Sequence, residues 1–114
     1  MAAVPDYEVL KALVDSASRL GLTFHLGPVI SSDKFYSGLD YLNRWIARGM
    51  IAIDMEAATL FLVGRHRRIK TGTSFVVSDV IGHAYEKMAT AEELREAVDK
   101  ASRAVLDAVV SVKV

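Results

Sequence analysis

The sequence contains no cysteine and no glutamine, and Asn43 is its only asparagine. The lack of cysteine excludes disulfide bonds, thiolate catalysis and cysteine-bound metal. Proteins from hot environments tend to contain few asparagine and glutamine residues, whose amides are thermolabile. Chance in a short chain explains the scarcity equally well, so a thermophilic origin stays one of two open interpretations.

The chain also lacks an excess of charge of either sign and lacks long apolar runs. Its 14 basic residues balance 14 acidic ones, which gives no electrostatic reason to expect nucleic acid or a membrane surface as a partner. No apolar run approaches the roughly 20 residues that cross a bilayer. The first 13 residues have neither the basic flank nor the apolar stretch of a signal peptide. We therefore expect a cytoplasmic chain.

The composition is that of a globular protein, and its patterning alternates between helix and strand. The 114 residues are 52% hydrophobic and 25% charged, which predicts one domain over residues 1–114. Helical spacing of apolar residues predicts helices over 5–20, 39–48, 57–66 and from Thr90 onward, where Thr90 and Glu93 form a capping box. Apolar runs predict strands over 22–30, 50–55 and 71–78. This order predicts an α/β fold with a largely parallel sheet covered by helices on both faces.

Three polar clusters follow the predicted strands, at residues 31–36, 54–56 and 78–79. In parallel α/β sheets, polar groups at the carboxyl ends of the strands face the ligand crevice. We therefore expect the three clusters to converge on a binding site.

Two carboxylates in these clusters could carry chemistry. Glu56 stands between a strand and a helix, where it could accept both hydrogen bonds of a ribose diol and stabilise positive charge at the anomeric carbon. It could equally complement the dipole of the helix. Asp79 ends an apolar strand, where partial burial could make it a general acid, or it could simply cap the following loop.

Other motifs point less clearly to a ligand. Phe35 and Tyr36 could pack on a flat base or fold back on the core. The three histidines match no metal-ligand spacing, so we expect no metal site. The basic run at 65–68 is better explained as a solvated helix end than as a nucleic-acid site.

The segments SSDKFY at 31–36, DMEAATLF at 54–61 and VVSD at 76–79 occur in an order that resembles the purine nucleoside phosphorylase and uridine phosphorylase family. The resemblance runs from about Asp6 to Val110 and covers the latter half of a typical member. It implies a partial three-layer α/β/α domain with a mixed, largely parallel sheet of the phosphorylase/hydrolase-like kind.

The resemblance also implies roles for individual residues. Phe35 would stack on the nucleobase, with Tyr36 lining the same pocket. Met55 would lie against the ribose and Glu56 would hold its hydroxyls. Asp79 would donate a proton to purine N7, with Ser78 beside it.

Some positions depart from the family pattern. Many members have glutamate at the position of Asp54, and Arg95 is about one residue out of register with an arginine that assists the acid in purine members. Uridine phosphorylases carry Gln and Arg where this chain has Leu39 and Tyr41, and together with the presence of Asp79 this favours a purine nucleoside.

Family members bind phosphate, the co-substrate, through segments of their N-terminal half, and the resemblance implies no further cofactor. We therefore expect catalysis to require completion by a homo-oligomer or by a separately encoded N-terminal half. An unpaired sheet edge and a mean hydropathy of +0.26 favour such association. Three alternatives remain: a purine nucleosidase, a non-catalytic purine-binding or assembly subunit, and a structural relic without a ligand.

Overall fold

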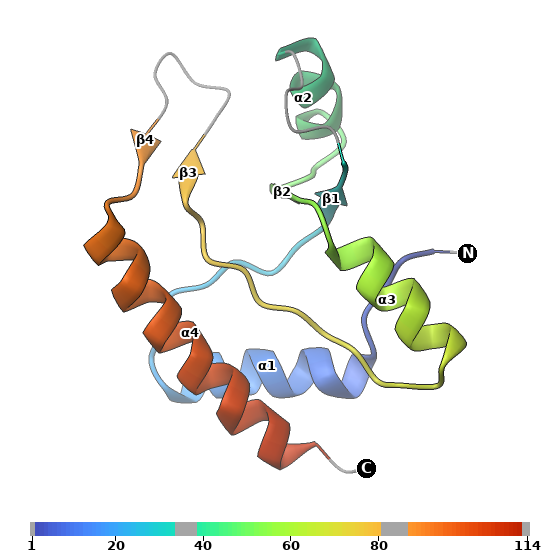
Figure 1. Cartoon of the computed structure of the whole chain (residues 1–114), viewed down its shortest axis with the longest axis vertical. Coiled ribbons are helices and arrows are strands. Elements are labelled where there is room, and N and C mark those ends of the chain that lie inside the picture. Colours follow the sequence, from blue (N-terminus) through green and yellow to red (C-terminus); the bar gives the residue numbers. More distant parts are fainter. Residues whose placement is uncertain (1, 34–38, 81–86, 113–114) are drawn as a thin grey trace.

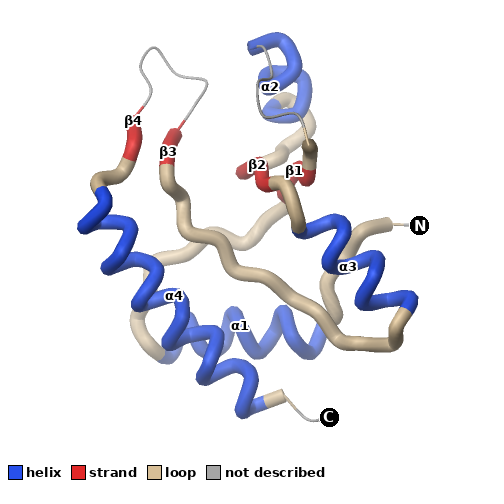
Figure 2. The backbone as a smooth tube through the Cα atoms, in the orientation of Figure 1, coloured by secondary structure: helices blue, strands red, loops and turns tan. Residues whose placement is uncertain are grey.

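The computed structural model describes residues 2–33, 39–80 and 87–112. It is a mixed α/β structure, as the sequence predicts, and these residues form four helices and two short strand pairs (Figures 1 and 2). The molecule is flat, with extents of 44 × 36 × 21 Å.

Helix α1 covers Tyr7–Arg19. The helix begins two residues later than predicted, because the Asp6 carboxylate caps it by accepting hydrogen bonds from the N–H groups of Glu8 and Val9. Gly21 closes the helix with a φ of 70°, in the left-handed conformation predicted for it. The N–H of Leu22 then bonds to the carbonyl of Ala17, which completes a Schellman turn.

Strands β1 (Val29–Ser31) and β2 (Ala52–Asp54) pair in parallel, and helix α2 (Leu39–Ile46) lies between them in the sequence. Both strands are shorter than predicted. Residues 22–28 form no strand, since Pro28 has no N–H to donate to a sheet and residues 22–28 are largely exposed. Helix α2 also ends before Arg48, and a turn runs on to Gly49, whose φ is 84°.

The second half of the chain contains helix α3 (Ala57–His66), a hairpin and helix α4 (Ala91–Ser111). The predicted strand over 71–78 is wrong: this segment is irregular, and the strands are β3 (Asp79–Val80) and β4 (Lys87–Met88), an antiparallel pair. The carbonyl of Thr71 bonds instead to the N–H of Asp6, at 2.8 Å. The predicted parallel pairing is therefore confirmed for β1 and β2 only.

Helix α4 begins at its predicted cap. Thr90 Oγ1 accepts the N–H of Glu93 at 3.1 Å. The Glu93 carboxylate accepts from the Thr90 hydroxyl rather than from its backbone N–H, so one half of the predicted capping box is present.

Helices α1 and α4 cross and pack against each other (Figure 1). The small side chains of Ser16, Ala104 and Ala108 are buried there, whereas the larger Val98 and Val109 of α4 are exposed. Arg19 forms an ion pair with Asp107 across this contact. The Arg19 guanidinium, helped by the Ser16 hydroxyl, holds the pKa of Asp107 below its usual value.

Much apolar surface is uncovered. Among the described residues, the buried apolar side chains are Ala57, Ala104 and Ala108. Larger apolar side chains are exposed on α3, on α4 and in the loops, among them Leu26, Ile51, Val63, Val77, Leu106 and Val110.

Candidate functional site

The parallel register of β1 and β2 brings two of the predicted polar clusters together. Ser31 stands opposite Asp54 at the carboxyl ends of the two strands. The Ser31 hydroxyl donates to Asp54 Oδ1 at 2.6 Å. The N–H of Ser32 donates to the carbonyl of Asp54 at 2.9 Å, which extends the connection by one residue.

The same two side chains hold the start of α3. Asp54 Oδ2 accepts the N–H groups of Glu56 at 3.1 Å and Ala57 at 2.8 Å. Ser31 Oγ accepts the N–H of Ala58 at 2.9 Å. Three otherwise unpaired N–H groups at the helix start are thereby satisfied by two side chains from neighbouring strands. We call this set, Ser31, Asp54 and residues 56–58, the strand–helix junction.

Glu56 occupies the N-cap position of α3 but does not cap it through its side chain. Within the part of the chain that the structure describes, its carboxylate makes no hydrogen bond or ion pair. Capping, one structural explanation for an acid at this point, is therefore performed by Asp54. Glu56 and its neighbour Met55 are both exposed, which leaves them available to a ligand.

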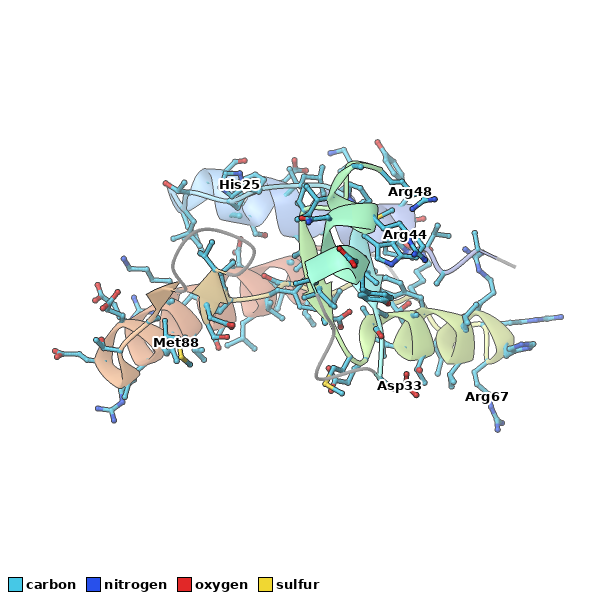
Figure 3. All side chains as sticks on the ribbon, turned by 90° about the horizontal axis from the view of Figure 1, so that it is seen from above. His25, Asp33, Arg44, Arg48, Arg67 and Met88 are labelled. Carbon is cyan, nitrogen blue, oxygen red and sulfur yellow. The ribbon has the colours of Figure 1, made fainter. Side chains whose placement is uncertain are left out.

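The loop that precedes α2 carries the predicted base contacts. Phe35 and Tyr36 lie outside the described residues. Asp33, just before them, is exposed (Figure 3). On α2, Tyr41 donates from its hydroxyl to Ser32 Oγ at 3.4 Å and packs edge-on against Trp45 with ring centroids 6.3 Å apart. Tyr41 therefore links α2 to the end of β1.

The third predicted cluster belongs to a different sheet. Ser78 and Asp79 lie at the start of the β3–β4 hairpin, which does not pair with β1 or β2. The Ser78 hydroxyl donates to Asp79 Oδ1 at 2.7 Å, and both residues are exposed. Arg95 is exposed on α4 and forms no ion pair with any described residue. The structure thus joins Ser31 and Ser32 of the first cluster to Asp54 of the second, and it places the third cluster in a different sheet.

The basic residues 65–68 are exposed at the end of α3, as a solvated helix end requires, and Arg67 projects outward (Figure 3). The described residues contain no group of three or more metal-ligating side chains. None of the helices in the described ranges is both long and apolar enough to span a membrane.

Ser31 is the site residue whose role the sequence did not predict. The sequence pattern assigns it only to the polar cluster at 31–36, with no function of its own. The available signal is its position at the end of a predicted strand, where polar groups of a parallel sheet share one edge.

Comparison with known proteins adds the family. The sequence profile of the Phosphorylase superfamily matches residues 1–112. A guanosine phosphorylase from Halorubrum lacusprofundi is 34% identical over 113 residues, which cover 94% of this chain and 47% of that protein. The uridine phosphorylase of Escherichia coli is 27% identical, with 93% of this chain and 47% of the relative covered.

A purine nucleoside phosphorylase of the DeoD type from Streptococcus uberis is 32% identical over 90 residues, covering 78% of this chain and 38% of the relative. The chain therefore spans about half the length of the curated relatives that it matches. With a profile match over nearly its whole length, the chain belongs to the Phosphorylase superfamily.

Proposed function

We propose that this chain supplies the base- and ribose-binding part of a purine nucleoside phosphorylase, which transfers the pentose of a purine nucleoside to phosphate. The observation that carries the proposal is that Asp54 and Glu56 have different roles at the strand–helix junction. Asp54 caps α3, and the Glu56 carboxylate is left exposed with no hydrogen bond or ion pair to any described residue.

The ribose contact follows from the chemistry of Glu56. A vicinal diol offers two O–H donors, and one carboxylate can accept both. Its negative charge would also favour the cationic character that develops at the anomeric carbon as the glycosidic bond breaks. Met55, exposed beside it, would pack against the sugar ring.

The base would be bound by Phe35 and Tyr36 and protonated by Asp79, with Ser78 beside the acid and Arg95 as an assisting cation. An acid is needed because a purine leaves slowly as an anion unless N7 is protonated or hydrogen-bonded. The Ser78 hydroxyl bonded to Asp79 Oδ1 leaves the other carboxyl oxygen to face a base. Leu39 and Tyr41 replace the Gln and Arg of uridine phosphorylases, which supports a purine.

A complete active site would require the part of the relatives that this chain does not match. Phosphate, the only co-substrate in the proposal, would be held by residues of that part, supplied by an N-terminal half, or by a homo-oligomer. The exposed apolar side chains support such an assembly. Without a positioned nucleophile, the chain alone would lose the roughly 7–11 kcal/mol that positioning can contribute.

Two alternatives use the same residues. A purine nucleosidase would replace phosphate by water. A non-catalytic subunit would bind purine nucleosides without turnover. One experiment distinguishes both alternatives from the proposed phosphorylase.

The experiment measures base release from adenosine, inosine and methylthioadenosine, with and without phosphate. It uses the chain alone and the chain mixed with a polypeptide that carries the unmatched part of the guanosine phosphorylase. We expect phosphate-dependent release in the mixture only. Release without phosphate would establish a nucleosidase, and nucleoside binding without release in any mixture would establish a binding subunit. Phosphate-dependent release by the chain alone would contradict the need for a second part.

A further inference from the structure

The geometry points to Asp54 and Ser31 as a pair of positioning residues, which fix the backbone of Glu56 for the ribose without touching the nucleoside themselves. This inference rests on the proposed function, since it assumes that Glu56 holds the ribose. It goes further because it assigns to Asp54 and Ser31 the role of positioning Glu56.

The hydrogen-bonding capacity of Asp54 is nearly used up. An ionised carboxylate has about four lone-pair sites. Three are occupied, by the Ser31 hydroxyl on Oδ1 and by the N–H groups of Glu56 and Ala57 on Oδ2. One site remains, whereas a ribose diol requires two. Asp54 is also half-buried, while Glu56 is exposed. Of the two acids, only Glu56 has the capacity to hold a diol.

Ser31 connects the pair to the helix. A hydroxyl has one donor and two acceptor sites. Ser31 donates to Asp54 at 2.6 Å and accepts the N–H of Ala58 at 2.9 Å, so it joins β1, β2 and α3 through a single oxygen. Consecutive N–H groups at residues 56, 57 and 58 are therefore held from two strands, and the backbone at Glu56 is restrained on its helical side.

The length of the Asp54 side chain suits this task. A short acid reaches N–H groups two and three residues ahead of itself, which is the geometry of an Asx turn. Glutamate is one methylene longer and would carry its carboxylate past these groups. Asp54→Glu, although it keeps the charge, should therefore disturb the junction.

The first test needs no ligand. We would measure hydrogen exchange of the Ala58 amide by NMR in the wild-type chain and in Ser31→Ala, Ser31→Thr and Ser18→Ala. Ser18 is an exposed serine on α1 and serves as the matched control. We expect Ser31→Ala to accelerate exchange about tenfold, as for the loss of one capping bond. The exchange rate in Ser31→Thr should stay within about twofold of wild type because threonine keeps the hydroxyl. The rate in Ser18→Ala should also stay within about twofold because Ser18 lies on α1, away from the junction. Unchanged exchange in Ser31→Ala would overturn the hydrogen-bonded junction.

The second test measures the affinity of the chain for inosine and for hypoxanthine, the same base without ribose. We expect Asp54→Glu to weaken inosine binding about tenfold, or 1.4 kcal/mol, and to leave hypoxanthine binding within about twofold. A general loss of structure would weaken the binding of both ligands. The ratio of the two affinities therefore reports on the positioning of Glu56 alone. In a Glu56→Gln background, Asp54→Glu should have no further effect on inosine.

If Asp54→Glu and Glu56→Gln have multiplicative effects on the affinity for inosine, Asp54 contacts the ribose itself. That result would overturn the inference. A wild-type chain that prefers hypoxanthine or binds both equally would contradict the proposed function and the positioning role together. The exchange result would still decide whether Ser31 and Asp54 hold the helix, so the two failures are distinguishable.

Discussion

The substitution Gly64→Ala tests the packing of α3. Two opposing effects decide whether it raises or lowers the free energy of unfolding. An alanine in a helix interior is more favourable than glycine by about 0.5–1 kcal/mol. Yet a Cβ at this buried glycine would lie 2.5 Å from Thr71 Cγ2 and 3.2 Å from the carbonyl oxygen of Ile69. Overpacking of this kind costs typically 1–3 kcal/mol.

The neighbours of Gly64 have little freedom to move away. The N–H of Ile69 bonds to the Gly64 carbonyl at 2.8 Å, and the Thr71 carbonyl accepts from Asp6 at 2.8 Å. Thr71 is also β-branched and stiff at χ1. We therefore expect the clash to outweigh helix propensity, and Gly64→Ala to lower the free energy of unfolding by about 1–2 kcal/mol.

The assay is urea denaturation followed by circular dichroism, with Thr71→Ala as the background that removes the clash. In that background Gly64→Ala should be neutral within about 0.5 kcal/mol or stabilising, because propensity then dominates. A Gly64→Ala protein as stable as wild type would refute the packing argument. An equal cost in both backgrounds would show that the strain comes from the backbone rather than from Thr71.

Three further predictions concern stability. Thr90→Ala should lower the unfolding free energy by about 1 kcal/mol in urea denaturation, because the cap of α4 is lost; an unchanged midpoint would contradict the cap. Gly49→Ala should cost about 1–2 kcal/mol by the same measurement, since φ is 84° there; a neutral result would show that the turn rearranges. Asp107→Asn should lower the thermal midpoint at pH 7. The pKa of Asp107 is lowered by Arg19, so its contribution is full above about pH 4 and should be lost as pH falls through that lowered pKa; a difference that does not change with pH would contradict the ion pair.

The parts of the fold set by local chemistry were predicted best. Gly21 and Gly49 end their helical turns as expected because glycine alone adopts positive φ without strain. Thr90 likewise begins α4. Strands were predicted less well, because a strand needs a partner as well as an apolar sequence. Residues 71–78 have the composition of a buried strand but form no ladder.

For the candidate site, the sequence predicts where the residues lie relative to strands and helices better than it predicts how they contact one another. The positions of Asp54 and Glu56 at a strand–helix junction follow from the pattern, but the capping role of Asp54 depends on register with Ser31, 23 residues earlier. No local rule fixes that register. The separate placement of Ser78 and Asp79 in a hairpin likewise depends on tertiary pairing with Met88 and its neighbours.

The central claim is that Glu56 recognises the ribose of a purine nucleoside, and a calorimetric titration of wild type and Glu56→Gln with inosine and hypoxanthine tests it most directly. Glu92→Gln, an exposed acid on α4, is the control. Hydrogen bonds to a charged group contribute about 1.5–3 kcal/mol, so wild type and the control should bind inosine at least about tenfold more tightly than hypoxanthine, and Glu56→Gln should lose that preference. A preference that survives Glu56→Gln would contradict the account.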